Sequence, residues 1–291
     1  MWNAKRVSVV LPTFNERESI RKVIEEFYST GLVDEVIVVN NNAAPGTSEE
    51  VRGTGALEVT EPRQGYGWAI RKGLEIASGE LIVLAEPDGT FEPRDVVKLL
   101  AYSDDFHYVL GTRTTRELIW AGANMGWFLR WGNWAVAKLI EVLFNCPILT
   151  DAGCTMRLLS RDALRRIQGA FAVGGSQFGP HLTLLAIAAR VPLFEVSVNY
   201  RPRVGKSAVT GSLVKAIVLG LQMIGLILSF RVRTALGLWD RSRVIPYPTP
   251  LPQDAQAGER PRAPAASKGS SRSLFDSRRE AWKRDVELTA R

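Results

Sequence analysis

Two carboxylates spaced two residues apart, Glu86 and Asp88, directly follow the apolar run of residues 81–85. That run is too short for an average helix and is bounded by Gly79 and Gly89, so it predicts a strand buried on both faces. In an open parallel sheet, ligands bind beyond the carboxyl ends of the strands. Carboxylate oxygens at that edge suit a hard divalent cation that holds a diphosphate. The sequence therefore predicts a cation and diphosphate site at this position.

Polar residues also follow other apolar segments of the first half. Residues 12–16 follow the first predicted strand, residues 40–42 the second and residues 63–67 the third. A turn or a helix cap explains each of these segments alone about as well as a binding site does. Because the carboxyl ends of parallel strands share one edge of a sheet, we expect the segments to converge beside Glu86 and Asp88.

Strands and helices alternate between residues 6 and 110. The predicted strands are residues 7–11, 35–39, 56–59, 80–85 and 108–110, and the predicted helices are residues 16–28, 47–52, 66–77 and 93–102. Pro12 is expected to end the first strand. Strands separated by helices of this length imply βαβ crossovers. The expected fold class is therefore α/β, with a Rossmann-like, mostly parallel sheet flanked by helices.

Two apolar segments follow this part of the chain. Residues 120–144 contain Trp120, Trp127, Trp131 and Trp134 and fit either a buried amphipathic helix or a helix at a membrane interface, where Trp is enriched. Residues 213–230 predict a second helix about 27 Å long, slightly shorter than the roughly 30 Å hydrocarbon core of a bilayer. We expect an interfacial or partly inserted helix, with a core helix as the alternative. The membrane helices could also mediate self-association.

The charge of the chain is unevenly distributed. Residues 241–291 hold 11 Lys and Arg against 6 Asp and Glu, which is +5 of the net +7. This Pro-, Ala- and Ser-rich stretch predicts a disordered basic tail. The rest is nearly neutral, so nucleic acid is not expected as a partner. We expect a catalytic domain in residues 1–211, an apolar juxtamembrane helix in residues 212–240 and the tail in residues 241–291.

The motifs and their order resemble those of inverting GT-A glycosyltransferases of family 2, particularly the polyprenyl-phosphate (dolichol-phosphate) mannose and glucose synthases. The resemblance covers roughly residues 5–210. It rests on residues 9–16, 36–42, 69–74, 86–90, 111–113, 151–157 and 200–207. Any one of these motifs is weak, whereas seven in the family's order are a strong signal.

The resemblance implies a role for each matching residue. The nucleotide sugar would be bound by Pro12, Thr13, Asn15, Glu16, Asn40, Arg63, Gly65, Glu86 and Pro87. Mg²⁺ or Mn²⁺ would be held by Glu86, Asp88 and Thr90. The acceptor phosphate would be bound by Arg113, Arg157, Arg201, Arg203, Lys206 and Ser207. The catalytic groups would be Asp88, Asp151 and Arg113.

The chain departs from the family's usual pattern at several positions. Asn40 and Asn41 replace an Asp pair, and Glu86 with Pro87 stands where Asp and a small residue are usual. His181 occupies a place where many relatives have Glu, although a lone His on a helix more often packs in a core.

The implied reaction is transfer of a hexose from a GDP- or UDP-linked sugar to a polyprenyl phosphate at the cytoplasmic face of the cell membrane. No signal-peptide pattern precedes the first strand. A phosphate acceptor is already ionised near neutral pH, whereas an alcohol acceptor would need a general base, for which Asp151 is the best candidate. The alternatives are a family 2 enzyme with another lipid or saccharide acceptor and a catalytically impaired scaffold that binds nucleotide sugars.

Overall fold

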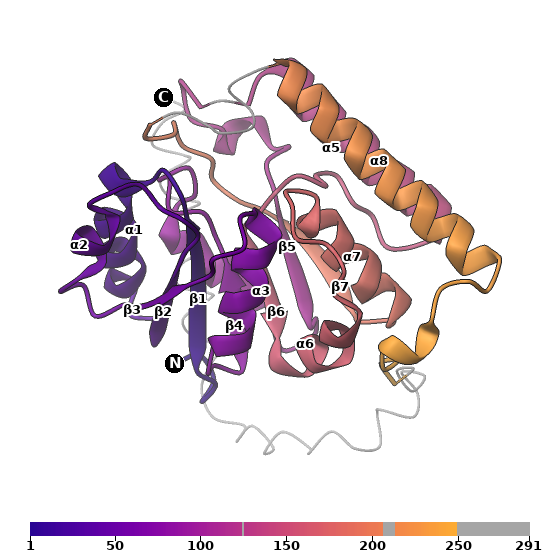
Figure 1. Ribbon diagram of the computed structural model, residues 1–291, viewed down its shortest axis with the longest axis horizontal. Coiled ribbons are helices and arrows are strands. Elements are labelled where there is room, and N and C mark those ends of the chain that lie inside the picture. The colour runs from indigo at the N-terminus through magenta and orange to yellow at the C-terminus, as the bar shows by residue number, and fades with distance from the viewer. Residues whose placement is uncertain (124, 206–212, 249–291) are drawn as a thin grey trace, which may run out of the picture. The chain divides into compact units, whose positions relative to one another are not determined.

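A seven-stranded sheet forms the centre of the molecule (Figure 1). The computed structural model describes residues 1–123, 125–205 and 213–248. In the order in which they lie in the sheet, the strands are β3 (Leu57–Thr60), β2 (Glu35–Asn40), β1 (Val7–Thr13), β4 (Leu81–Leu84), β6 (Arg157–Ser160), β5 (Tyr108–Thr112) and β7 (Leu193–Ser197). Of these strands, β6 alone runs antiparallel to its neighbours. The predicted fold class, a Rossmann-like and mostly parallel α/β sheet, is confirmed.

Helices cover both faces of the sheet because successive strand residues point to opposite sides. On one face α1 (Arg17–Ser29) and α4 (Val96–Ala101) pack against residues such as Val9 and Val36. On the other face α3 (Tyr66–Ile76), α6 (Arg161–Ile167) and α7 (Phe178–Ala188) pack against Val10, Ile37 and Val39. The short helix α2 (Thr47–Val51) lies beside α1 (Figure 1). The predicted helix over residues 93–102 consists of a 3₁₀ turn, Pro93–Asp95, followed by α4.

Pro12 lies inside β1, so the expectation that it ends the strand is wrong. The backbone of Val10 faces β4, since its carbonyl oxygen accepts from Ala85 N. Backbone groups two residues apart in a strand face the same side, so those of Pro12 also face the side of β4. At this position β4 has already ended, at Leu84. Its missing N–H therefore removes no hydrogen bond from the sheet, and β1 continues to pair with β2 as far as Thr13.

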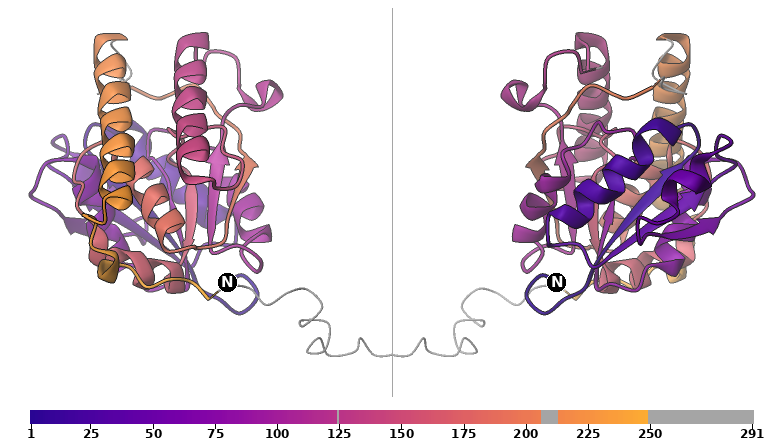
Figure 2. Two further views of the ribbon diagram at one scale, coloured as in Figure 1. Left: turned by 90° about the vertical axis from the view of Figure 1, so that its right-hand side faces the viewer. Right: turned by 90° about the vertical axis from the view of Figure 1, so that its left-hand side faces the viewer.

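Two long helices lie side by side beyond α7 (Figure 2). They are α5 (Trp127–Phe144), which begins later than the expected residue 120, and α8 (Leu213–Ala235). Phe144 and Phe230, near the ends of the two helices, have ring centroids 5.9 Å apart, so the helices run in the same direction. With 23 residues, α8 extends past the predicted end at residue 230 and is about 35 Å long.

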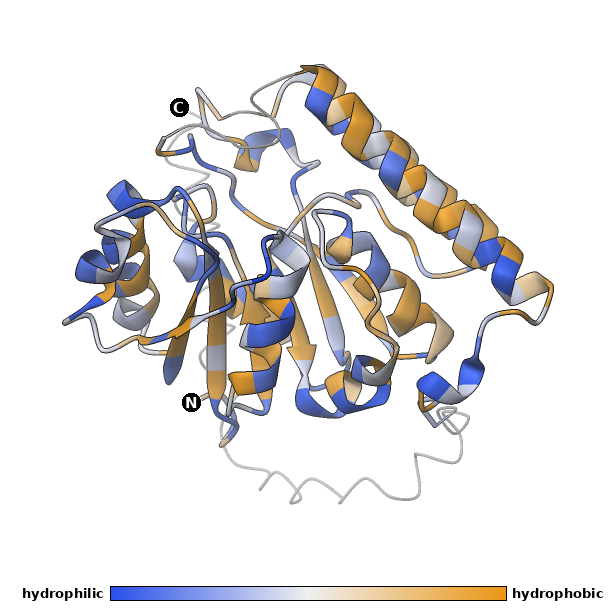
Figure 3. Cartoon of the chain, viewed as in Figure 1, coloured by the Kyte–Doolittle hydropathy of each residue, from blue (hydrophilic) through white to orange (hydrophobic). Residues whose placement is uncertain are grey.

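The surface of α8 is mostly apolar and exposed. The helix buries Met223, Ile227 and Phe230 against its neighbours, whereas residues such as Val214 and Leu221 are 69% and 63% exposed. Figure 3 shows the apolar colouring along most of its length. Within the described ranges, α8 is the one helix long and apolar enough to cross a membrane, by length and composition only.

Residues 241–248, which we expected to belong to the disordered tail, pack against the body. Val244 is buried, Ile245 N donates to the carbonyl oxygen of Arg166 at 2.9 Å, and Tyr247 N donates to that of Ala189 at 2.6 Å. The Tyr247 ring lies 4.6 Å from the ring of His107. The chain therefore returns to the body shortly after α8. The rest of the predicted tail, residues 249–291, lies outside the described residues.

Candidate active site

Polar residues from several segments meet at one edge of the sheet. The strands β1 to β5 and β7 all end at this edge, and the antiparallel strand β6 begins there. A cavity of ≈ 360 Å³ lies at the same edge; we call it the strand-end cavity. Its lining residues are Pro12, Thr13, Phe14, Glu16, Asn41, Gln64, Gly65, Tyr66, Ala69, Glu86, Pro87, Arg113, Gly153, Thr155, Ser176, Tyr200, Arg203, Leu219 and Met223.

Three carboxylates, which we call the acid cluster, surround the guanidinium of Arg203: Glu16, Glu86 and Asp88. Arg203 Nη1 lies 2.7 Å from Asp88 Oδ2 and 3.9 Å from Glu86 Oε2, and Nη2 donates to Glu16 Oε1 at 3.1 Å. Asp88 is fully buried, and its Oδ1 accepts hydrogen bonds from Thr90 N and Thr90 Oγ1. Thr90 therefore orients Asp88. Burial and the neighbouring charge of Asp88 raise the pKa of Glu86 to about 8.

The donor set of the acid cluster fits a divalent cation. The cluster already surrounds one cationic group, and carboxylate oxygens are the ligands that Mg²⁺ and Mn²⁺ prefer. Within the described ranges, no three His, Cys, Asp or Glu side chains are arranged as a metal site of their own. Glu86 and Asp88 would therefore hold the ion together with diphosphate oxygens and water, as is usual for Mg²⁺.

Arg113 and Asp151 form a buried ion pair beside the cavity. Asp151 Oδ2 accepts from Arg113 Nε at 2.8 Å and from Arg113 N at 3.0 Å, and Oδ1 accepts from Arg113 Nη2 and Gly153 N, each at 3.0 Å. Burial alone would raise the pKa of Asp151, but the charge and hydrogen bonds of Arg113 outweigh it and lower that pKa. Asp151 does not line the cavity, whereas Arg113 does. The arrangement makes Asp151 the group that positions Arg113, and does not support its predicted role as a base.

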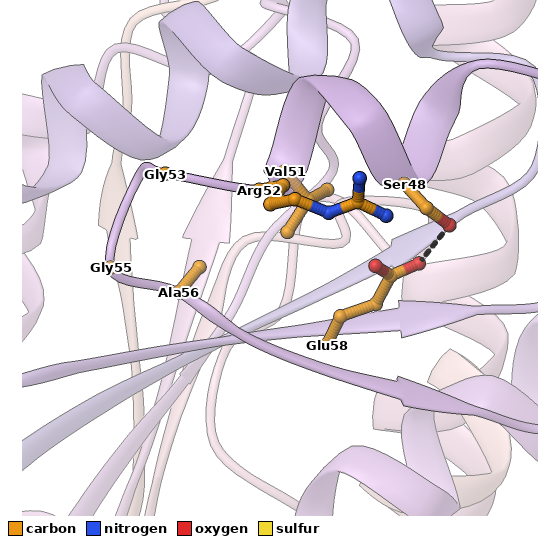
Figure 4. A pocket seen from close by; sticks show the side chains of 7 residues that line it. All are labelled: Ser48, Val51, Arg52, Gly53, Gly55, Ala56 and Glu58. Atoms are coloured by element: carbon orange, nitrogen blue, oxygen red, sulfur yellow. Dashed lines mark hydrogen bonds between the residues drawn. The ribbon is translucent and has the colours of Figure 1, made fainter.

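The two asparagines that end β2 and follow it point in different directions. Asn40 Nδ2 donates to Glu58 Oε1 at 2.9 Å. Ser48 Oγ donates to the same oxygen at 2.7 Å, as Figure 4 shows. Ser48 and Glu58 border a separate cavity of ≈ 460 Å³. Asn41, not Asn40, lines the strand-end cavity. Asn40, which we expected to face the base, is therefore directed toward Glu58, and the neighbouring Asn41 forms part of the wall of the strand-end cavity.

Asn41 holds the loop after β3 against this wall. Its Nδ2 donates to the carbonyl oxygens of Glu61 and Arg63 at 2.7 and 2.8 Å, and its Oδ1 accepts from Gly65 N at 2.8 Å. Gly65 has a φ of 144°, and a Cβ there would lie 2.4 Å from the carbonyl oxygen of Gly174. A glycine is therefore required where the loop approaches both the cavity and residue 174.

Arg157 does not reach the strand-end cavity, so the structure does not support its predicted role in binding phosphate. It is buried, with Nε donating to the carbonyl oxygen of Cys154 and Nη2 to that of Ala152. Its Nη1 donates to the hydroxyl of Tyr108 and the carbonyl oxygen of Gly179, both at 2.7 Å. Arg157 links the start of β6 to α7 instead.

Other predicted site residues lie away from the cavity lining. Arg201 forms ion pairs with Glu26 and Glu92. Arg63 is paired with Glu61, and its side chain is 60% exposed. Asn15 is exposed and does not line the cavity. The predicted phosphate ligands Lys206 and Ser207 lie outside the described residues.

His181 is a buried residue of α7. It is 4% exposed, and its Nε2 accepts a hydrogen bond from Ala172 N at 3.2 Å. Burial lowers its pKa to about 4. It does not line the strand-end cavity, so its position agrees with the alternative of a packed core histidine.

Several lining residues were not among the predicted site residues. Tyr66 belongs to the polar segment of residues 63–67, and Tyr200 belongs to the motif of residues 200–207. Their membership of these segments could have identified them as lining residues. Leu219 and Met223 belong to α8, which is distant in sequence from the other lining residues. Nothing in the sequence connects these two apolar side chains with Glu86.

Comparisons with known proteins give a consistent result. The family model described as "Glycosyl transferase family 2" matches residues 8–168. An uncharacterized glycosyltransferase of Mycobacterium tuberculosis is 33% identical over 215 residues, which cover 73% of this chain and 93% of that protein. The dolichyl-phosphate beta-glucosyltransferase of Mus musculus is 25% identical over 268 residues, covering 82% and 79%. The crystal structure of glucosyl-3-phosphoglycerate synthase from Mycobacterium tuberculosis with Mn²⁺, UDP and glucosyl-3-phosphoglycerate resembles the fold with a TM-score of 0.61 at 21% identity, covering 78% and 80%.

Proposed function

The chain belongs to glycosyltransferase family 2, and we propose that it transfers a hexose from a GDP- or UDP-linked sugar to a polyprenyl phosphate, with inversion at the anomeric carbon. One observation carries the proposal: the cavity lined by Glu86 and Arg203 is also lined by Leu219 and Met223 of α8. A substrate pair that fills such a cavity needs anionic groups and an apolar chain. A nucleoside diphosphate sugar and a polyprenyl phosphate together meet this requirement.

The strand ends supply the features that a nucleotide sugar needs. Glu16, Asn41 and Gly65 line the cavity at the ends of β1, β2 and β3, which is where α/β sheets bind ligands. The acid cluster lies next to them. A divalent cation held there by Glu86 and Asp88 would offset the negative charge that develops on the leaving diphosphate. Among the relatives, the mouse protein is named as a glucosyltransferase that acts on dolichyl phosphate.

The cavity favours an acceptor that is already ionised. Both oxygens of Asp151 accept hydrogen bonds from Arg113 and its neighbours, and His181 does not line the cavity. The carboxylates of the lining, Glu16 and Glu86, face Arg203. A phosphate monoester has a second pKa near 6, so its oxygen can attack without a general base. An alcohol would need one.

In the proposed reaction, a phosphate oxygen of the acceptor attacks the anomeric carbon on the side opposite the leaving group. The new carbon–oxygen bond forms as the bond to the nucleoside diphosphate breaks, so an α-linked donor gives a β-linked product. Arg113, which pairs with Asp151 and packs 5.0 Å from the Tyr200 ring, would orient the acceptor phosphate. Its held guanidinium needs little reordering when phosphate binds.

We also propose that the enzyme lies on the cytoplasmic face of the membrane without crossing it. Trp127 and Trp131 of α5 are 73% and 56% exposed, and α8 presents its apolar surface beside them. Trp and aliphatic residues suit the interface between headgroups and acyl chains. The contacts of Val244 and Tyr247 bring the chain back to the body after α8, which favours a helix lying along the surface over a membrane span.

Radiolabelled UDP-glucose and GDP-mannose, offered separately with Mn²⁺ to the purified full chain in detergent, test the proposal. The acceptors are a polyprenyl phosphate, the matching polyprenol and 3-phosphoglycerate. We expect label in the organic phase with the polyprenyl phosphate alone. Transfer to the polyprenol or only to the water-soluble acceptor would contradict the proposed acceptor and favour another family 2 activity.

A further inference from the structure

We infer that the guanidinium of Arg203 occupies the cation position of the acid cluster until the donor binds, so that divalent cation and nucleoside diphosphate bind cooperatively. This inference rests on the proposed use of a nucleotide sugar. Arg203 contacts Asp88, Glu86 and Glu16, which come from two separate strand ends. A divalent ion bound by Glu86 and Asp88 would occupy the region where this guanidinium now lies.

The backbone around Arg203 is fixed, so the exchange is a movement of its side chain. Val204 N donates to the carbonyl oxygen of Asp88 at 3.0 Å, and Arg201 N donates to that of Thr90 at 2.7 Å. These two hydrogen bonds tie the segment to the loop that carries the acids. The long Arg203 side chain can nevertheless turn about several single bonds.

The hydrogen bonds of Arg203 are incomplete in this position. Its Nε is buried and has no acceptor among the described residues. A buried unpaired donor is unfavourable. The guanidinium would therefore be stabilised by moving to a position where acceptors are available for all of its N–H groups. Phosphate oxygens provide such acceptors, because a guanidinium can donate two parallel hydrogen bonds to a phosphate.

Electrostatics then couples the two ligands. A divalent ion arriving alone must displace a guanidinium from its carboxylates, and the guanidinium gains no new partner. When a nucleoside diphosphate arrives with the ion, the diphosphate oxygens accept hydrogen bonds from the displaced Arg203, and the ion binds Glu86 and Asp88. The diphosphate therefore tightens ion binding, and by reciprocity the ion tightens diphosphate binding by the same factor.

The structure distinguishes Arg203 from the other arginines of this region. Arg113 keeps an internal partner, Asp151, that does not line the cavity. Arg201 is two residues away and pairs with Glu26 and Glu92, not with the acid cluster. Among the described arginines, Arg203 is the one that forms ion pairs with Glu86 and Asp88, so its displacement would expose the carboxylates that would hold the ion. Arg201→Gln is consequently a matched control that removes the same charge nearby without vacating the cluster.

The test is a titration of the full chain with Mn²⁺, followed by isothermal calorimetry and by the electron paramagnetic resonance signal of free Mn²⁺, without and with UDP or GDP. For the wild type we expect weak Mn²⁺ binding that the diphosphate tightens by about 10-fold or more. Arg203→Gln should bind Mn²⁺ alone about 10-fold more tightly, so its coupling should be weaker by that factor, while the part that comes from direct coordination of the ion by the diphosphate should remain. Arg201→Gln should keep the wild-type coupling.

Two results would overturn the inference. One is a Mn²⁺ affinity in Arg203→Gln that equals that of Arg201→Gln, and the other is a wild type that binds the diphosphate equally well with and without Mn²⁺. If Arg203→Gln does not fold, Arg203→Met, which also removes the charge, replaces it; an increase in Mn²⁺ affinity supports the inference, and no increase contradicts it. Coupling without transfer to a polyprenyl phosphate would contradict the proposed acceptor while leaving this inference intact.

Discussion

The two sides of the strand-end cavity are built in different ways. The polar side consists of short segments at strand ends, and its groups are fixed by hydrogen bonds, as with Asp88 by Thr90 and Asn41 by the loop after β3. The apolar side is a stretch of one helix, α8, that contributes Leu219 and Met223 through packing alone. Directional bonds hold the groups that do chemistry, whereas non-directional apolar contact suffices to accept a chain that has no polar features.

The largest effect is expected on the polar side. Asp88→Asn removes the charge of the buried acid with little change of shape, and we expect the transfer rate to fall by about 10³-fold. Glu86→Asp, which creates the acid pair more usual in relatives, is the matched variant and should keep activity within about 10-fold. Transfer by Asp88→Asn at more than a tenth of the wild-type rate would show that the chemistry does not depend on this acid.

The second prediction concerns the groups behind the polar side. Asp151→Asn breaks a buried ion pair, and we expect the free energy of unfolding in urea to fall by about 3 kcal/mol. Asp162→Asn is the control, because Asp162 forms a partly exposed pair with Arg166 and its loss should cost less than about 1 kcal/mol. Unchanged stability together with an altered pH–rate profile would instead assign Asp151 a role as base.

The third prediction separates the apolar side from the chemistry. Val214→Asp together with Leu221→Asp places two charges on the exposed surface of α8, and we expect sedimentation with anionic lipid vesicles to fall by about 10-fold or more. Binding of the nucleoside diphosphate should not change. Leu57→Asp with Val97→Asp makes the same substitutions at exposed apolar positions of β3 and α4. Equal loss of vesicle binding in both pairs would refute a specific role for α8.

The smallest effect is expected at Asn41. A carboxylate there cannot donate to the carbonyl oxygens of Glu61 and Arg63, so Asn41→Asp should release the loop and weaken nucleoside diphosphate binding by about 10-fold. The control is Asn42→Asp, since Asn42 is exposed and its Nδ2 donates to only one carbonyl oxygen of the loop, that of Pro62 at 3.3 Å, besides the side chain of Gln64 at 2.9 Å. Equal affinities of the two variants would indicate that the loop does not depend on Asn41.

Sequence reasoning placed the first five strands to within about two residues and gathered Glu86, Asp88 and Glu16 at one edge. It succeeded because strand periodicity and strand ends are local properties of the chain. It did not predict the partners of Arg157 and Arg201, whose positions along the chain matched a motif but whose side chains pair with carbonyl and carboxylate oxygens of the protein. A motif fixes where a long side chain starts and leaves its direction to the neighbours that the fold supplies.

The sequence by itself determined the α/β fold class, the carboxylates after β4 and the apolar character of residues 213–230. Only the tertiary structure decided that Arg203 lies across the acid cluster, that Asp151 is occupied by Arg113, and that Leu219 and Met223 share a cavity with Glu86. The physical reason is that these groups are distant in sequence and meet only once sheet register and helix packing are complete. Their contacts therefore depend on the whole fold and leave no local pattern in the chain.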